Sequence, residues 1–254
     1  MRARDGAPIV RFMVERVAFA ADVGVLKPWA EDVWIADGRT TPFYSVPYPT
    51  RMTIVRLGDG SLAVISPIRL ADCDVNAIDE LGPVSALIAP NKLHHLFLGE
   101  WKERYKDAKL YAAPGLAKRR KDLRFDAELN DRPDPKWASD IDQTILAGSF
   151  FMDEVVFFHR KSRTLIVTDC IQRFHSEWLN PFHRLLMRLD GMLGPKGGMP
   201  REWRASFINR KRARTAVERM IEWMPETIII AHGDPVTDDA MGYLRHSFRW
   251  LFKK

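Results

Sequence analysis

The chain has 254 residues, of which 46% are hydrophobic and 28% are charged. This composition excludes disordered and collagen-like chains, and it supplies enough apolar material for a sizeable core. Two cysteines, Cys73 and Cys170, are too few for a disulfide framework, and a net charge of +6 permits acidic partners without requiring them. We therefore expect an ordered protein of a reducing compartment.

Residues 1–25 are predicted to be an appendage to a single domain of residues 26–254. No stretch approaches the ~20 unbroken apolar residues of a membrane-spanning helix. Near the N-terminus, Arg11, Glu15 and Arg16 interrupt what would be the apolar core of a signal peptide. We therefore predict a cytoplasmic protein whose N-terminal segment is a short helix or an ordered tail.

The first third of the domain has the pattern of antiparallel β-structure. Short β-type runs occur at Val33–Ala36, Phe43–Val46, Met52–Arg56 and Leu62–Ser66. The last two runs are joined by residues 57–61, whose Asp59-Gly60 step is a strong hairpin signal. The domain is therefore expected to contain an early β-hairpin.

Strands and helices then alternate along the chain. Helical spacing of apolar residues predicts helices at Asp74–Leu81 and around Leu98–Tyr105. Val84–Ala89 is a continuous apolar run, which is typical of a strand covered on both faces. Further strands are predicted at Lys109–Ala113, Ile141–Leu146, Val155–Phe158 and Thr164–Thr168.

The C-terminal third is predicted to be mostly helical. A helix should begin at Asn180 and Pro181, with one apolar face. That face comprises Phe182, Leu185, Leu186, Leu189 and Leu193. One long helix is expected from about Pro200 to Met224, followed by a buried strand at Thr227–Ala231 and a closing helix at Asp238–Phe252. This order predicts an α/β layered domain with mixed sheets.

The segment Trp178–Phe207 is rich in Leu, Met, Phe and Gly. Its helical periodicity is explained by packing alone. The same composition also suits a lid over a cleft, an apolar wall for a substrate, or contact with a membrane surface. The sequence leaves these alternatives open.

Three of the predicted buried strands lead directly into side chains that bind metals. The residues concerned are His94, His95, Asp169 and His232. Ligands collect at the carboxyl ends of strands in open α/β sheets. Neutral imidazole and carboxylate are the usual ligands of zinc, iron and manganese. We therefore predict that these four residues are candidate metal ligands.

Three segments, Pro47–Thr53, Pro90–His95 and Asp153–Phe158, resemble the DUF4336 family, which is grouped with the metallo-β-lactamase-fold hydrolases. The resemblance covers about residues 26–252. It implies a four-layer αββα sandwich of metallo-β-lactamase type with two mixed β-sheets. It also implies metal-assisted hydrolysis, in which the ion lowers the pKa of a bound water and polarises the substrate.

The chain departs from the first motif of this superfamily, His-x-His-x-Asp-His. The corresponding residues are Asn91–His95, so the leading pair of metal-binding histidines is missing. Residues 148–153 contain no histidine where the superfamily has its next one. The resemblance therefore implies that one of the two metal positions has been lost.

The resemblance leaves the second metal position nearly intact. Asp169 matches the bridging aspartate and His232 the final histidine, while His94 or His95 takes the place of the Asp-His end of the motif. One divalent ion, either zinc, iron or manganese, is the implied cofactor. Asp169 and His232 are then also the expected catalytic residues, and Asp153 or Asp234, if nearby, would orient a ligand or accept a proton.

Two functions of different classes follow. The first is a metal-dependent hydrolase with a mononuclear site, acting on an unidentified small molecule. The second is a non-catalytic relative that lost the metal and binds a ligand or a partner. The missing His-x-His favours the second, whereas the retained Asp169 and His232 favour the first. The fold alone decides neither.

Other functional signals are weaker. Cys170 with His232 or His94 would suggest a thiol nucleophile, but no family-specific signature supports it. The basic runs Lys118–Lys121 and Arg210–Arg214 lack interleaved aromatic residues, so we do not expect nucleic-acid binding. His175 follows Asp169 closely enough to be a minor candidate for the same cleft. The sequence does not indicate an oligomeric state.

Overall fold

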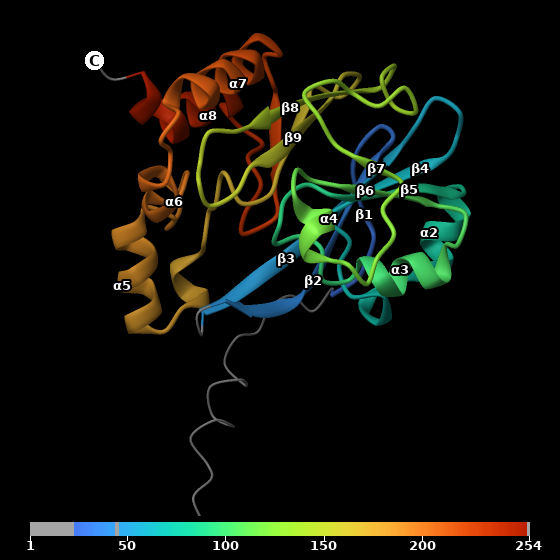
Figure 1. The fold of residues 1–254 in the computed structure, drawn as a ribbon. Coiled ribbons are helices and arrows are strands. Elements are labelled where there is room, and N and C mark those ends of the chain that lie inside the picture. The colour runs from blue at the N-terminus through green and yellow to red at the C-terminus, as the bar shows by residue number, and fades with distance from the viewer. Residues whose placement is uncertain (1–22, 44–45, 253–254) are drawn as a thin grey trace, which may run out of the picture.

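The computed structural model of the protein describes residues 23–43 and 46–252 (Figure 1). Most of the predicted N-terminal appendage therefore lies outside the described residues. Two β-sheets pack face to face, and helices cover the outer face of each sheet. This arrangement confirms the predicted four-layer αββα sandwich with two mixed sheets.

The larger sheet has seven strands in the order β1-β2-β3-β4-β5-β6-β7. Pairs from β1 to β4 are antiparallel, and pairs from β4 to β7 are parallel, so the early hairpin structure passes into α/β alternation. The strands are β1 (Lys27–Ala30), β2 (Val33–Phe43), β3 (Val46–Arg56), β4 (Leu62–Ile65), β5 (Val84–Ala89), β6 (Lys109–Ala112) and β7 (Ala127–Glu128). The hairpin predicted at Asp59-Gly60 is confirmed, since β3 and β4 pair across this turn.

The smaller sheet has four strands in the order β11-β10-β9-β8. β8, β9 and β10 are antiparallel neighbours, while β10 and β11 run parallel. The strands are β8 (Ile141–Leu146), β9 (Glu154–His159), β10 (Thr164–Val167) and β11 (Thr227–Ile230). The predicted boundaries of these strands agree with the structure to within one residue.

In space, the helices lie outside the two sheets (Figure 1). They are α2 (Val75–Leu81), α3 (Leu98–Arg104), α4 (Leu116–Arg119), α5 (Pro181–Asp190), α6 (Arg201–Ala205), α7 (Arg210–Glu222) and α8 (Ala240–Phe248), with 3₁₀ turns at Leu70–Asp72, Ser176–Trp178 and Arg249–Leu251. α2 and α3 pack on the larger sheet, and α6, α7 and α8 on the smaller one. No helix within residues 23–43 and 46–252 is long and apolar enough to cross a membrane.

The core between the sheets holds them together. It combines apolar side chains of the larger sheet, such as Val55 and Ile88, with Phe157 and Ile166 of the smaller sheet. Trp137 is fully buried there, and its indole Nε1 donates to Gln143 Oε1 at 3.0 Å. The polar edge of the ring is therefore satisfied, and its apolar body fills the space between the layers.

The prediction of one long helix from Pro200 to Met224 is wrong. The structure has α6 and α7, separated at residues 206–209. In this break the backbone pairs with residues 148–150: Phe150 N donates to Ser206 O at 3.1 Å, and Asn209 N donates to Gly148 O at 3.0 Å. These tertiary hydrogen bonds replace the bonds of a continuous helix, and Asn209 then caps α7.

Of the run predicted at Phe43–Val46, Phe43 ends β2 and Val46 begins β3, and residues 44–45 lie outside the described residues.

In α5 the predicted start is confirmed: Asn180 is the N-cap and Pro181 is at the first position. The apolar face of α5 nevertheless faces solvent. Its exposed members are Phe182, Leu185, Leu186 and Leu189, with exposed fractions of 65%, 53%, 38% and 59%.

Replacing Asn209 tests the break between α6 and α7. We expect Asn209→Ala to lower the free energy of unfolding by about 1 kcal/mol, because the side chain accepts a hydrogen bond from Arg212 N at 3.2 Å at the start of α7. Asn209→Ser keeps a capping oxygen and should retain most of that stability. Urea denaturation of the three proteins measures the difference. Equal stability of Asn209→Ala and the wild type would contradict this account.

Candidate metal centre

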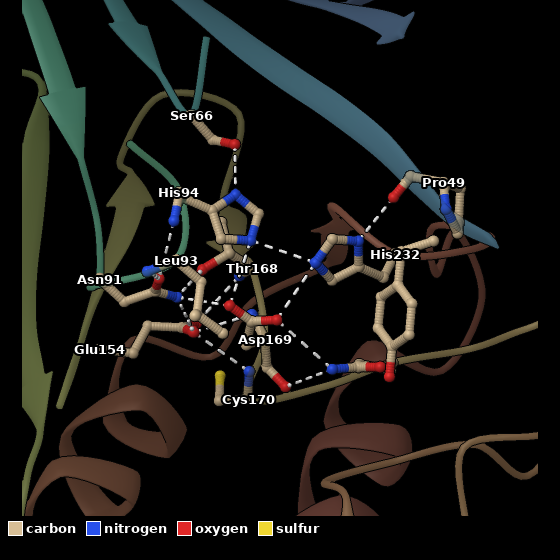
Figure 2. Close-up of polar contacts among 12 residues, drawn as sticks. Pro49, Ser66, Asn91, Leu93, His94, Glu154, Thr168, Asp169, Cys170 and His232 are labelled. Atoms are coloured by element: carbon tan, nitrogen blue, oxygen red, sulfur yellow. Dashed lines mark hydrogen bonds and ion pairs between the residues drawn. The ribbon is translucent and has the colours of Figure 1, made fainter. Parts of the chain in front are cut away.

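Three side chains that follow strand ends meet in one place (Figure 2). His94 follows β5 of the larger sheet, whereas Asp169 and His232 follow β10 and β11 of the smaller one. His94 Nε2 lies 3.1 Å from His232 Nε2, and each of these nitrogens lies 3.1 Å from one oxygen of Asp169. The structure therefore brings together three of the four residues that the sequence singled out.

The outer nitrogen of each imidazole is held by a neighbouring strand or loop. His232 Nδ1 lies 2.6 Å from the carbonyl oxygen of Pro49, which can only accept, so Nδ1 carries the proton. His94 Nδ1 lies 2.6 Å from Ser66 Oγ, and this hydroxyl donates to Arg51 O at 3.3 Å, which leaves it to accept from His94. In the neutral rings, both Nε2 lone pairs are therefore directed into the cluster.

The converging groups are all hydrogen-bond acceptors in this state, and they are largely buried. Burial raises the pKa of the Asp169 carboxyl, but His94 and His232 outweigh burial and hold that pKa well below its usual range. Burial lowers the pKa of His94, yet the Asp169 charge outweighs burial and the net shift is upward. A proton or a metal cation must therefore lie among these acceptors.

Two imidazole nitrogens and one carboxylate are a donor set that suits zinc and other divalent transition metals. The protons on Nδ1 are fixed by an oxygen outside the cluster, which is the arrangement usual for histidines that bind a metal. Three protein ligands would leave a fourth position for water or substrate. The residues present therefore fit one ion.

A side chain of β3 forms a hydrogen bond with the loop that carries His232. Arg51 Nη1 donates to the carbonyl oxygen of Gly233 at 2.6 Å, and Arg51 Nε donates to Asp37 Oδ1 at 2.7 Å. Gly233 has a φ of +113°, and a Cβ built there would lie 2.0 Å from Arg173 O. Only glycine fits this close approach, so the turn after β11 and the direction of His232 are set by the backbone.

The carboxylate of Glu154 is fully buried beneath the cluster and was not singled out from the sequence. Its Oε1 accepts from Thr168 N at 2.9 Å, and its Oε2 accepts from Asp169 N at 2.8 Å and from Cys170 N at 3.2 Å. These bonds fix the backbone turn that presents Asp169. The available sequence signal was a glutamate at the start of an otherwise apolar strand.

Asn91 is the second residue that sequence reasoning missed. Its Nδ2 donates to Asp169 Oδ2 at 2.7 Å and to Glu154 Oε2 at 3.1 Å, and its Oδ1 accepts from His94 N at 3.1 Å. Asn91 lies in the loop after β5. Here its amide links the loop of His94 to the carboxylate of Asp169.

His95 lies outside the triad, although it lines the same pocket. Its Nδ1 and its carbonyl oxygen each accept from Arg120 Nη1 at 2.8 Å. Burial, together with the charges of Arg120 and Arg119, lowers the pKa of His95 to about 4. The sequence left His94 and His95 as alternatives for one ligand position, and the geometry directs His94 to the cluster.

The remaining candidates lie away from the triad. Asp153 accepts from Gly148 N at 3.3 Å, and Asp234 pairs with His175. Cys170 is fully buried, and burial raises the pKa of its thiol well above the usual range. None of these side chains is among the described residues that line the pocket, so a thiolate nucleophile has no support in the geometry.

The triad opens into a pocket of about 340 Å³. β2 and β3 of the larger sheet line it together with the loops after β4, β5, β10 and β11, and α6 contributes Trp203. Part of the segment Trp178–Phe207 therefore forms a wall of the pocket. This volume lies within the ~300–1,000 Å³ range of small-molecule sites.

A protein-family model described as "Domain of unknown function (DUF4336)" matches residues 30–183. Among solved structures, a metallo-beta-lactamase from Pontibacter korlensis has a TM-score of 0.60 and 13% identity, covering 90% of this chain and 99% of that chain. A metallo-beta-lactamase from Hirschia baltica gives 0.59 and 13%, covering 90% and 97%. The metallo-beta-lactamase FIM-1 from Pseudomonas aeruginosa, in its mono-zinc form, gives 0.61 and 12%, covering 92% and 97%. No curated protein matches the sequence.

Glu154→Gln tests the support beneath the triad. The amide would direct N–H donors at backbone N–H groups that now bind a carboxylate, so we expect the free energy of unfolding to fall by about 2–4 kcal/mol. Zinc affinity should fall by about tenfold or more, because Asp169 loses its fixed position. Glu128→Gln is the matched control, since Glu128 is exposed and accepts one bond, from Gly115 N. Equal effects of the two substitutions, by urea denaturation and zinc titration, would contradict this role.

Proposed function

Because the chain belongs to the DUF4336 family and has the fold of the metallo-beta-lactamases, we propose that it is a hydrolase that uses one divalent metal ion. His94, Asp169 and His232 are the proposed ligands. The observation that carries the proposal is the convergence of two imidazole lone pairs and a carboxylate at 3.1 Å, with the opposite nitrogen of each ring held from outside.

One ion, rather than two, is proposed because the first position of the superfamily lacks its ligands. Residues 91–93, in the region of the first motif, contain no histidine, and residues 148–153 contain none either. The neighbour FIM-1 is described in a mono-zinc form, so a protein of this fold can hold a single ion. Zinc, iron and manganese all remain compatible with the donor set.

The chemistry that a bound ion supplies is a lowered pKa of water and polarisation of the substrate. The side chains of the protein do the rest. Pro49 and Ser66 keep the two imidazoles in the tautomer whose Nε2 is free to bind, and Asn91 donates to Asp169 Oδ2 and orients this carboxylate. Asp169 and His232 are proposed as catalytic residues because they face the pocket where the substrate would react.

Metal content measured by plasma mass spectrometry tests the proposal. We expect the wild type to hold about one ion per chain, and His94→Ala and His232→Ala to weaken metal binding by about 100-fold or more. His95→Ala is the matched control, because it removes the adjacent imidazole and should retain the metal. A wild type that binds no zinc, iron or manganese after incubation with each ion would favour the alternative of a non-catalytic ligand-binding protein.

Metal binding should also release protons. The pKa of His94 is raised in the metal-free protein, so near neutral pH a proton competes with the ion and affinity should increase as the pH rises. Titration calorimetry with zinc, in two buffers of different ionisation enthalpy at pH 7, should show net proton release. His95→Ala should release the same number, because the pKa of His95 is about 4 and its ring is already neutral. Buffer-independent heats would contradict this assignment.

A further inference from the structure

The pocket beside the triad has mainly apolar walls. Buried parts of the wall come from Ile68, Met152 and Trp203, with exposed fractions of 1%, 4% and 4%. The indole Nε1 of Trp203 donates to Ser149 Oγ at 3.2 Å, and Ser149 does not line the pocket. Trp203 therefore presents apolar ring surface to a ligand, while its polar edge is satisfied elsewhere.

The mouth of the pocket is also apolar. Leu96 and Phe151 line it and are 56% and 49% exposed, respectively. Large apolar side chains at the rim of a concave site favour ligands that bury hydrocarbon surface there. The apolar character therefore extends from the buried wall beside the triad to the opening.

Positive charge around the pocket is sparse. Arg119 is the one lysine or arginine among the described residues that line it, and Glu202 contributes a carboxylate. Phosphodiesters and nucleotides are usually bound by several charge-assisted donors. A single arginine with a glutamate in the same lining does not provide such a set, so these substrates are disfavoured.

We propose that the site takes neutral carboxylic esters or thioesters that carry an apolar chain, with the chain in the apolar pocket and the carbonyl at His94, Asp169 and His232. This substrate class rests on the proposed hydrolase function. In the reaction, the oxygen of water bonds to the carbonyl carbon and the C–O or C–S bond breaks. One proton of the water goes to the alcohol or thiol that leaves, the acyl group becomes a carboxylate, and the other proton passes to solvent.

Binding of esters to the full chain, freed of metal with a chelator, tests the inference without requiring hydrolysis. The probe is the neutral dye N-phenyl-1-naphthylamine, displaced by methyl butanoate, methyl hexanoate and methyl octanoate. The dissociation constant should tighten by about fourfold for each added methylene until the pocket is filled. Dimethyl phosphate, as a phosphodiester control, should displace little dye.

Two adjacent phenylalanines provide the matched variants. Phe151 lines the pocket, whereas Phe150 is 73% exposed and does not. Phe151→Gln should weaken methyl octanoate binding by about fivefold, and Phe150→Gln should leave it unchanged. Neither side chain is buried in the core, so neither change should unfold the protein, and circular dichroism checks this.

The outcomes separate this inference from the proposed function. Affinity that does not depend on chain length, or equal effects of the two phenylalanine variants, would overturn the apolar substrate class even in a protein that holds its metal. The apolar ligand class is supported if affinity increases with the chain length of the ester and Phe151→Gln weakens this binding. If such a protein bound no metal, the hydrolase proposal would fail while the apolar ligand class stood.

Discussion

The buried carboxylate of Glu154 is the constraint on which the site depends. It accepts backbone N–H groups from three consecutive residues, Thr168, Asp169 and Cys170, and the side-chain amide of Asn91. These contacts join the ends of β9 and β10 to the loop after β5, so they connect the two sheets at one point (Figure 2). A buried charge without these partners would be strongly destabilising, so the loops are held in this geometry.

The three segments that carry the family resemblance meet at this point. From residues 47–53, Pro49 fixes His232 and Arg51 holds the carbonyl of Gly233. Residues 90–95 supply His94 and Asn91, and residues 153–158 supply Glu154. Segments that are distant in sequence are therefore joined by one polar network. Within these segments, Pro49, Asn91 and Glu154 orient the triad or its backbone.

Asn91 links the loop after β5 to both carboxylates of the candidate site. Its amide donates to Asp169 and Glu154 and its carbonyl accepts from the backbone of His94. A neutral side chain thus stabilises the two buried carboxylates of the candidate site. The pocket above it is apolar and carries little charge, so binding of substrate would depend mainly on burial of hydrocarbon surface.

Local patterns predicted most of the elements because their signals lie within a few residues. The apolar run Val84–Ala89 is β5, the Asp59-Gly60 turn joins β3 and β4, and Asn180-Pro181 starts α5. The pattern failed where distant backbone competed with it. Residues 206–209 pair with residues 148–150 and divide the predicted long helix, and periodicity cannot register such a contact.

The sequence by itself determined the sandwich of two mixed sheets and the strand ends at which His94, Asp169 and His232 occur. Only the tertiary structure decided that His94 rather than His95 joins the triad, because Arg120, from a distant segment, holds the neighbouring ring. It also decided that the apolar face of α5 is exposed, since periodicity identifies a face and not what covers it. Glu154 acquires its role in the same way. Its carboxylate fixes the turn that presents Asp169 only because folding brings three backbone N–H groups to it.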